Sequence, residues 1–263
     1  MPLVNATPFR QIVRTYSAML NARHKIAHPL EAPVNLYERL GFTFLLERSS
    51  LVDRVMIETG TWEPQQLAYF AGLVERFRDK PAAAFFDIGS YWGLYSLLAW
   101  RSGVFDKMVA FDGDRHNFAK LQANLFLNNA AYSITAMNKA VSDKPGELRF
   151  WDSRTHPDKN RAGVGVVEDG RPSYPVEAVT VDSFVSSTGG YLLLKIDVEG
   201  HEESVLKGMH NTLANNKVVM QIEIYEPQHE RVFAEVGRLG LRQIHSIYPD
   251  YYLTNMTVEE LGV

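Results

Sequence analysis

Four apolar runs in this sequence each end in a carboxylic acid, and no other feature restricts the possible fold as strongly. The runs read AAAFFD, KMVAFD, YLLLKID and KVVMQIE, and the acids that close them are Asp87, Asp112, Asp197 and Glu223. Each run is nearly continuous in apolar residues, which is typical of parallel strands buried on both faces. Segments with helical spacing lie between the runs. The sequence therefore predicts an α/β fold, a doubly wound and mostly parallel sheet with right-handed crossovers.

The order of the segments also predicts how the chain is organised. Residues 1–80 are expected to form an N-terminal helical and hairpin extension or cap, and residues 81–263 the ligand-binding domain. Within the extension, residues 42–58 are expected to form a short hairpin, and Pro64 to open a helix. LRQIHSIY and YYLTN are expected to close the sheet as an antiparallel pair. Ligands of doubly wound sheets bind at the carboxyl ends of the strands, so the four acids are expected to share one site.

Two segments allow more than one interpretation. Residues 1–30 contain no acid, and a helix that begins after Thr7-Pro8 could pack on the domain or on a second subunit of a homo-oligomer. It could also lie on a membrane surface or cover the active site. Residues 151–175 are rich in Asp, Arg, Gly and Pro and show no periodicity, so they form either a mobile lid or a plain surface loop.

The composition excludes several classes of protein. With 263 residues, 46% of them hydrophobic, the chain can build an ordinary globular core. It has no cysteine, which excludes disulfides, thiol nucleophiles and thiolate metal sites. No apolar run is long enough for a transmembrane segment and no secretory pattern is visible, so a cytoplasmic location is expected. The net charge of −4 gives no reason to expect a nucleic-acid partner.

The turn after the first predicted strand reads G-S-Y-W-G, from Gly89 to Gly93. Glycines at this place let the backbone approach a ligand closely. The spacing is not the G-x-G-x-x-G of dinucleotide-binding proteins, and Tyr91 and Trp92 occupy the place where that fingerprint admits a pyrophosphate. Asp112 ends the second strand, where an acid can accept hydrogen bonds from ribose hydroxyls. A ribose without a pyrophosphate indicates S-adenosylmethionine.

Several segments, in their order and spacing, resemble FkbM-family S-adenosylmethionine-dependent methyltransferases. They are DIGSYWGLYSLLA, AFDGDRHNFAKLQANLFLNN, NKAVSD, LLLKIDVEGHEESVLKG and QIEIYEP. The resemblance covers residues 82–227 and implies a class I methyltransferase whose seven-stranded sheet has an antiparallel last strand. It also implies O-methylation of a hydroxyl on a sugar, glycan or natural product. The chain departs from the family where F-E-P is replaced by Phe111-Asp112-Gly113 and where G-A-N-x-G is replaced by G-S-Y-W-G.

The predicted cofactor site follows from these motifs. The turn after the first strand is expected to lie beneath the methionine portion of S-adenosylmethionine, with Asp87 holding its amino group directly or through water. Asp112 is expected to bind the ribose, Asn138 the adenine edge, and Ala140 the ring. The predicted cofactor-binding residues are Asp87, Gly89, Ser90, Tyr91, Gly93, Asp112, Gly113, Asn138 and Ala140.

The predicted catalytic residues are Asp197, His201 and Glu223, with Glu199 and Lys195 at the substrate. Methyl transfer needs the acceptor oxygen, methyl carbon and sulfur in line, and a weakly acidic hydroxyl also needs a base or a metal. Histidine titrates near neutral pH and suits the role of base. The acids together with the histidine could instead bind a divalent cation such as Mg²⁺. The sequence leaves the choice between base and metal open.

Three aromatic residues are candidates for the acceptor pocket, and two functions other than methyl transfer are disfavoured. Trp92, Tyr95 and Trp151 could line an acceptor pocket, although core packing is the more frequent explanation for any one of them. A nicotinamide-dependent oxidoreductase on a similar sheet is disfavoured by the missing glycine fingerprint. A non-catalytic binding module is disfavoured because it would have no use for acids at four strand ends. The preferred partner is a small-molecule or carbohydrate acceptor.

Overall fold

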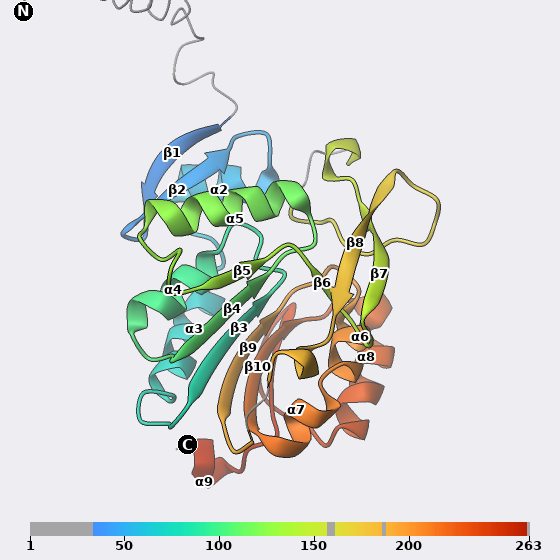
Figure 1. The fold of residues 1–263 in the computed structure, drawn as a ribbon. Coiled ribbons are helices and arrows are strands. Elements are labelled where there is room, and N and C mark those ends of the chain that lie inside the picture. The colour runs from blue at the N-terminus through green and yellow to red at the C-terminus, as the bar shows by residue number, and fades with distance from the viewer. Residues whose placement is uncertain (1–33, 157–160, 186–187, 262–263) are drawn as a thin grey trace, which may run out of the picture. The chain divides into compact units, whose positions relative to one another are not determined.

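The structure, a computed structural model, describes residues 34–156, 161–185 and 188–261. Its main feature is a seven-stranded sheet in the order β11-β12-β10-β9-β3-β4-β5 (Figure 1). The strands from β10 to β5 are parallel, and β12 is antiparallel to both of its neighbours. The strands are β3 Ala83–Ile88, β4 Lys107–Phe111, β5 Thr135–Met137, β9 Tyr191–Ile196, β10 Lys217–Glu223, β11 Arg242–Ile247 and β12 Asp250–Thr254. The predicted class I methyltransferase sheet, with its antiparallel closing strand, is confirmed.

The central strands bury both faces, as their continuous apolar pattern predicts. Successive residues of β3 point to opposite sides, so that Phe85 belongs to one hydrophobic core and Phe86 to the other. The first core is covered by α3 Pro64–Glu75, α4 Leu94–Ser102 and α5 Arg115–Leu127. The second is covered by α6 Glu202–Lys207, α7 His210–Asn215 and α8 Glu226–Arg238, on the other side of the sheet in Figure 1. The short α9 Val258–Leu261 follows β12.

The extension before β3 contains a hairpin and two helices. The hairpin consists of β1 Val34–Arg39 and β2 Phe42–Glu47, and α2 Leu51–Thr59 follows it before α3. The prediction of a hairpin over residues 42–58 is therefore wrong in its second half. Val52, Met56 and Ile57 have helical spacing and bury one face of α2 in the first core, and this pattern outweighs the apparent alternation. The predicted N-terminal helix lies outside the described residues.

Residues 36–263 form one compact unit. A domain boundary near residue 80 stays a prediction. Within the described part of the chain, no helix has the length and apolar character needed to cross a membrane.

A second, small sheet follows β5. It consists of β6 Ala140–Val141, β7 Gly146–Trp151 and β8 Ser173–Val179, in the order β6-β8-β7. The segment GELRFW forms β7, and it pairs antiparallel with β8. The connection between them begins with the 3₁₀ turn η1 Ser153–Thr155, and a second such turn, η2 Val181–Ser183, follows β8. Phe150 also pairs with Val166 of this connection, which brings the connection beside the carboxyl ends of the main sheet.

Candidate active site

A cavity of about 260 Å³ lies at the carboxyl ends of β3, β4, β9 and β10. This is the point at which the strand order reverses, because β4 lies on one side of β3 and β9 on the other. All four strand-end acids line the cavity, as predicted. So do the other predicted site residues except Gly93 and Asn138; the lining members are Asp87, Gly89, Ser90, Tyr91, Asp112, Gly113, Ala140, Lys195, Asp197, Glu199, His201 and Glu223.

The turn from Gly89 to Gly93, which follows β3, is called the cofactor turn below. Its two glycines are required by protein contacts as well as by backbone conformation. Gly89 and Gly93 have φ values of +83° and +88°, which side chains disfavour. A Cβ on Gly89 would lie 1.6 Å from the carbonyl oxygen of Asp197, and one on Gly93 would lie 2.6 Å from a methyl group of Leu121. Sequence reasoning attributed these glycines to a close ligand. The structure shows that the neighbouring strand and α5 already occupy the space.

Asp87 is buried at the end of β3, where its carboxyl group faces the first turn of α4. Its Oδ2 accepts hydrogen bonds from the backbone N–H of Ser96 at 3.0 Å and from the Ser96 hydroxyl at 2.5 Å. Burial raises the pKa of Asp87 to about 6, although the bonds from Ser96 and the charge of Lys195 oppose the shift. The side chain is therefore held rigidly at the floor of the cavity.

Asp112 organises the loop after β4. Its Oδ2 accepts from the N–H of Tyr91 and its Oδ1 from the N–H of Asp114, each at 2.8 Å. Burial and the neighbouring Asp114 carboxylate raise the pKa of Asp112 well above its ordinary value, while the two N–H groups act in the opposite direction. Asn138 uses its side-chain amide to donate to the carbonyls of Asp112, at 2.8 Å, and Gly113, at 3.2 Å. Its predicted contact with adenine stays a prediction.

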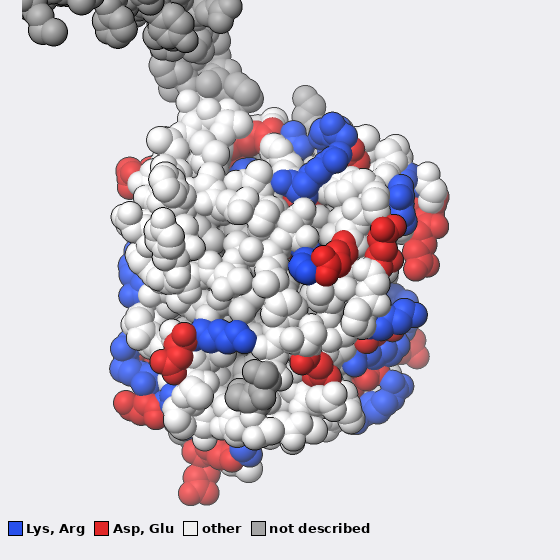
Figure 2. All heavy atoms as spheres, in the orientation of Figure 1, with Lys and Arg blue, Asp and Glu red and all other residues white. Residues whose placement is uncertain are grey.

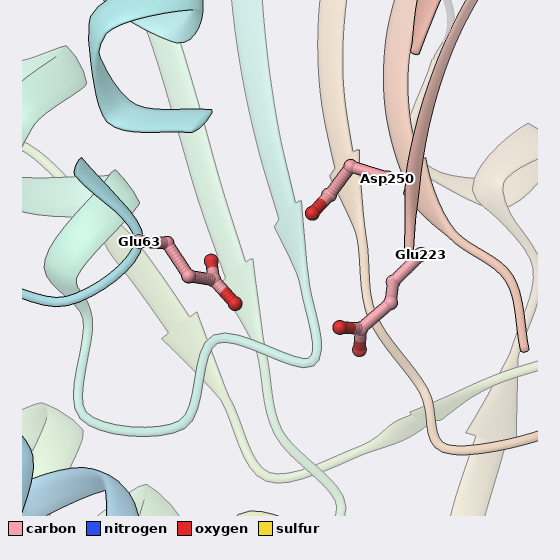
Figure 3. A group of neighbouring side chains, drawn as sticks. All are labelled: Glu63, Glu223 and Asp250. Atoms are coloured by element: carbon pink, nitrogen blue, oxygen red, sulfur yellow. The ribbon is translucent and has the colours of Figure 1, made fainter. Parts of the chain in front are cut away.

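Carboxyl groups crowd the other end of the cavity around a single ammonium group. The Nζ of Lys195 lies 3.2 Å from Oδ1 of Asp250 and 3.5 Å from Oδ2 of Asp197. Glu63, from the loop before α3, and Glu223 and Asp250, from β10 and β12, point toward one another (Figure 3), and they include oxygen atoms that all lie within 4.8 Å of one another.

A second group of acids overlaps the first. It consists of Asp197, Glu199 and Glu223, with oxygen atoms at the same mutual distance. Both groups contain only oxygen ligands, which are the kind that Mg²⁺ and Ca²⁺ prefer. Glu223 belongs to both groups and stands between them.

This crowding changes the ionisation of the cluster. Burial raises the pKa of Glu63 to about 7, with further upward contributions from the carboxylates of Asp250 and Asp197. Burial and the Asp197 carboxylate raise the pKa of Glu223. For Lys195, the charges of Asp250 and Asp197 outweigh burial and hold its pKa well above the ordinary value. The cluster therefore retains protons at neutral pH and keeps its ammonium charged.

Behind the cluster lies a chain of buried polar side chains. The Tyr95 hydroxyl donates to Oε2 of Glu63 at 3.2 Å, and the side-chain amide of Gln221 donates to Oδ1 of Asp250 at 2.8 Å. Among the described residues, three buried atoms here have no hydrogen-bond partner: Oε1 of Gln221, Oδ2 of Asp250 and the hydroxyl of Tyr252. Buried polar atoms without partners are rare in folded proteins, so this end has unused hydrogen-bonding capacity.

His201 lies at the start of α6, where the sequence predicts it. Its Nε2 is 2.9 Å from the Ser142 hydroxyl, and burial lowers its pKa, so the ring is neutral at neutral pH. A neutral imidazole can accept a proton, which keeps the predicted role of base chemically possible.

Sequence reasoning missed the walls of the cavity. Leu51, Val52, Trp62 and Glu63 come from the extension, Phe150 from the small sheet, and Tyr225 from the turn after β10. Trp92 and Tyr95 line the cavity as suggested. Trp151 lies instead in a second hollow, which Glu199 also lines. The apolar spacing of the extension indicated burial, but no sequence signal indicated which surface it would cover.

Comparison with known proteins identifies the family. The Methyltransferase FkbM domain matches residues 87–245. A search of curated proteins found no match. Similar solved structures include the ribosomal protein L11 methylase of Lactobacillus delbrueckii subsp. bulgaricus, with 13% identity, a TM-score of 0.44, and 73% of this chain and 79% of that chain covered.

A second similar structure is SMU.1697c of Streptococcus mutans, described as a methyltransferase and solved in complex with SAH. It shows 12% identity, a TM-score of 0.45, and coverage of 74% of this chain and 97% of that chain. The family match extends from Asp87 through all four strand-end acids and covers more than half of the sequence. The chain therefore belongs to the FkbM family of S-adenosylmethionine-dependent methyltransferases.

Proposed function

We propose that the chain binds S-adenosylmethionine across the β3–β4 half of the cavity. The two oxygens of Asp112 each accept one loop N–H and keep lone pairs for ribose hydroxyls. Ala140, Val141 and Phe150 supply an apolar wall beside them that suits an adenine ring. Asp87 lies deeper, where a carboxylate can hold the ammonium of the methionine portion. The residues present thus fit this cofactor, which supplies a methyl group on a sulfonium.

The acceptor in this proposal is a hydroxyl of a sugar, glycan or natural product. The observation that carries it is the convergence of Asp197, Glu199 and Glu223 at the β9–β10 end of the same cavity. Carboxylates accept hydrogen bonds from hydroxyl groups, and several of them in one wall suit an acceptor with more than one hydroxyl. Trp62 and Tyr95 add aromatic surface to that wall.

The proposed reaction requires the protein to align the acceptor hydroxyl and to remove one proton from it. Asp197 and Glu223 bind the acceptor hydroxyl and orient its oxygen toward the methyl carbon. The Asp197 carboxylate takes up the hydroxyl proton, because Glu223 already carries a proton at neutral pH. His201 is the alternative base. Lys195 balances the charge of the Asp197 carboxylate, because its ammonium lies 3.5 Å from Oδ2 of Asp197.

We propose proton transfer to Asp197 in preference to an Mg²⁺ site formed by Asp197, Glu223 and His201. An ammonium group already balances Asp197, and the Nε2 of His201 is engaged by Ser142 at 2.9 Å. Dialysis against EDTA before the assay separates the two mechanisms. Full activity is expected without added metal, and activity restored only by Mg²⁺ would support the metal.

A nucleic-acid acceptor is not part of this proposal. The chain has a net charge of −4, and Figure 2 shows Lys and Arg side chains interspersed with Asp and Glu on the face that it draws. Nucleic-acid binding depends on clustered positive charge that neutralises phosphates.

The test supplies S-adenosylmethionine with a deuterated methyl group to sugar nucleotides, glycosides and hydroxylated polyketides. Products are identified by mass spectrometry and the methylated atom by NMR. Labelled O-methyl groups are expected in at least one of these classes. Labelling only of amines or of nucleic acid would contradict the proposal.

Two variants identify the base once an acceptor is found. Asp197→Asn is expected to lower kcat about 100-fold or more while leaving the affinity for S-adenosylhomocysteine unchanged. His201→Gln is expected to lower kcat by less than about tenfold, because it is not the primary base. The opposite ranking would make His201 the base. Glu230→Gln, exposed on α8, is the matched control.

A further inference from the structure

The side chain of Tyr91 leaves the cofactor turn and enters the extension. Its hydroxyl donates to Oδ1 of Asp53 at 2.6 Å and lies 2.7 Å from the Ser50 hydroxyl. Because the phenol donates to Asp53, Ser50 must be the donor in the second hydrogen bond. Ser50 and Asp53 belong to the start of α2, more than 30 residues before the turn that they contact.

Asp53 also connects the turn to α5. Its Oδ2 accepts the backbone N–H of Glu47 at 2.7 Å and forms an ion pair with Lys120. The Lys120 ammonium lies 4.8 Å from the centre of the Tyr91 ring, a cation–π distance. Both Asp53 and Lys120 are almost completely buried, and neither contributes a buried polar atom without a hydrogen-bond partner in the described part of the chain.

These contacts anchor the side chain of Tyr91, and its backbone connects them to the proposed cofactor site. Tyr91 has a φ of +51°, in the left-handed region that a non-glycine residue adopts only when its surroundings hold it there. In that conformation its N–H donates to Oδ2 of Asp112, the acid at the ribose position. The residue thus joins the extension, through its side chain, to Asp112, through its backbone.

We propose that Asp53 and Ser50 are positioning residues for S-adenosylmethionine. They do not line the cavity, and they act by holding Tyr91 so that its N–H orients the Asp112 carboxylate. This explains why the chain can carry tyrosine at a turn position where its family commonly has asparagine. The extension is then a part of the cofactor site. The proposal rests on cofactor binding in this cavity but not on the nature of the acceptor.

The first experiment compares wild type with Tyr91→Phe by titration with S-adenosylhomocysteine, well below the unfolding temperature. The variant keeps the ring and removes only the hydroxyl, whose partners lie outside the cavity. Its dissociation constant is expected to rise about tenfold, as for the loss of one charge-assisted hydrogen bond. The control is Tyr132→Phe, which removes a hydroxyl from a fully exposed ring and is expected to bind as wild type does.

The second experiment tests whether Asp53 acts through Tyr91. Asp53→Asn is expected to raise the dissociation constant by a similar factor. The double variant Asp53→Asn/Tyr91→Phe is expected to have the same dissociation constant for S-adenosylhomocysteine as the single variant that binds less tightly. Both changes remove the same hydrogen bond, so their effects should not add. Ser50→Ala leaves the hydrogen bond between Tyr91 and Asp53 intact, and it is expected to raise the dissociation constant about threefold. This variant can replace Asp53→Asn if the latter fails to fold.

Two readouts distinguish positioning from a merely structural role. A structural role would lower the unfolding midpoint of Tyr91→Phe and leave its affinity for S-adenosylhomocysteine at the wild-type value. That outcome would overturn the proposal. Failure of wild type to bind S-adenosylhomocysteine would overturn the cofactor placement as well, so the two failures can be told apart.

Discussion

The carboxyl groups at the two ends of the cavity have different partners. At the β3–β4 end, Asp87 and Asp112 each accept two hydrogen bonds from the loops beside them. At the β9–β10 end, Asp197 and Asp250 share the single ammonium of Lys195. The first end is organised by neutral backbone and hydroxyl donors, and the second by charge.

The difference has a consequence for ligands. Carboxyl groups held by fixed donors keep their geometry whether or not a ligand is present, which suits a cofactor used in every turnover. The charged end holds protons on Glu63 and Glu223 and leaves Oδ2 of Asp250 without a partner among the described residues. Its hydrogen bonds can rearrange when an acceptor enters. Variants at the charged end should therefore change mainly the free energy of unfolding, and variants at the β3–β4 end mainly the affinity for the cofactor.

The largest effect is expected from Lys195→Met. This change leaves the buried Asp250 and the partly exposed Asp197 without their ammonium partner, and removal of one member of a buried ion pair destabilises proteins by about 3–5 kcal/mol. Urea denaturation of both proteins gives the free energy of unfolding. Lys144→Met, at an exposed position, is the control. A loss below about 1 kcal/mol would mean that the cluster adapts by taking up protons, and would remove Lys195 from the organisation of this end.

A smaller effect, which depends on pH, is expected from Glu63→Gln. Below pH about 4.5 the carboxyl group is protonated in the folded and the unfolded chain alike. Between there and its folded pKa of about 7, the unfolded chain releases the proton and the folded protein keeps it, so folding becomes less favourable as the pH rises. Glutamine does not titrate and escapes this loss.

The wild type should therefore lose about 2–3 kcal/mol more stability than Glu63→Gln between pH 5 and pH 8. Unfolding free energies of both proteins at the two pH values give the difference. Glu58→Gln, exposed on α2, should follow the wild type. Parallel curves for wild type and Glu63→Gln would show that Glu63 ionises normally and that the contrast between the two ends is smaller than the geometry indicates.

The two ends also differ in how far the sequence predicts them. Continuous apolar runs define buried parallel strands without reference to the rest of the fold, and Asp87, Asp112, Asp197 and Glu223 could be placed at their ends for that reason. The parallel sheet alone brings these residues together, since the carboxyl ends of its strands meet at one edge. The parallel sheet and most of the cavity floor were therefore predictable.

The walls were not predictable, because they depend on packing between segments far apart in the chain. Glu63 directly precedes the helix that begins at Pro64, and Asp250 begins a closing strand, so neither sequence position indicates an active-site acid. The anchor of Tyr91 depends on Asp53, whose burial the sequence pattern of the extension does not reveal. Polar contacts of this kind follow no periodicity, whereas strands and helices do.

The smallest effect is expected from Asp112→Asn, at the end held by neutral donors. Asparagine keeps the shape and one acceptor oxygen, but its amide cannot accept the second loop N–H, and it removes the charge offered to the ribose hydroxyls. Calorimetric titration should show affinity for S-adenosylhomocysteine falling about tenfold, or about 1.4 kcal/mol. Asp106→Asn, on an exposed loop before β4, should bind normally. Since Glu63→Gln lies at the charged end, its cofactor affinity should stay near wild type, and equal losses in both variants would show that the two ends act as one site.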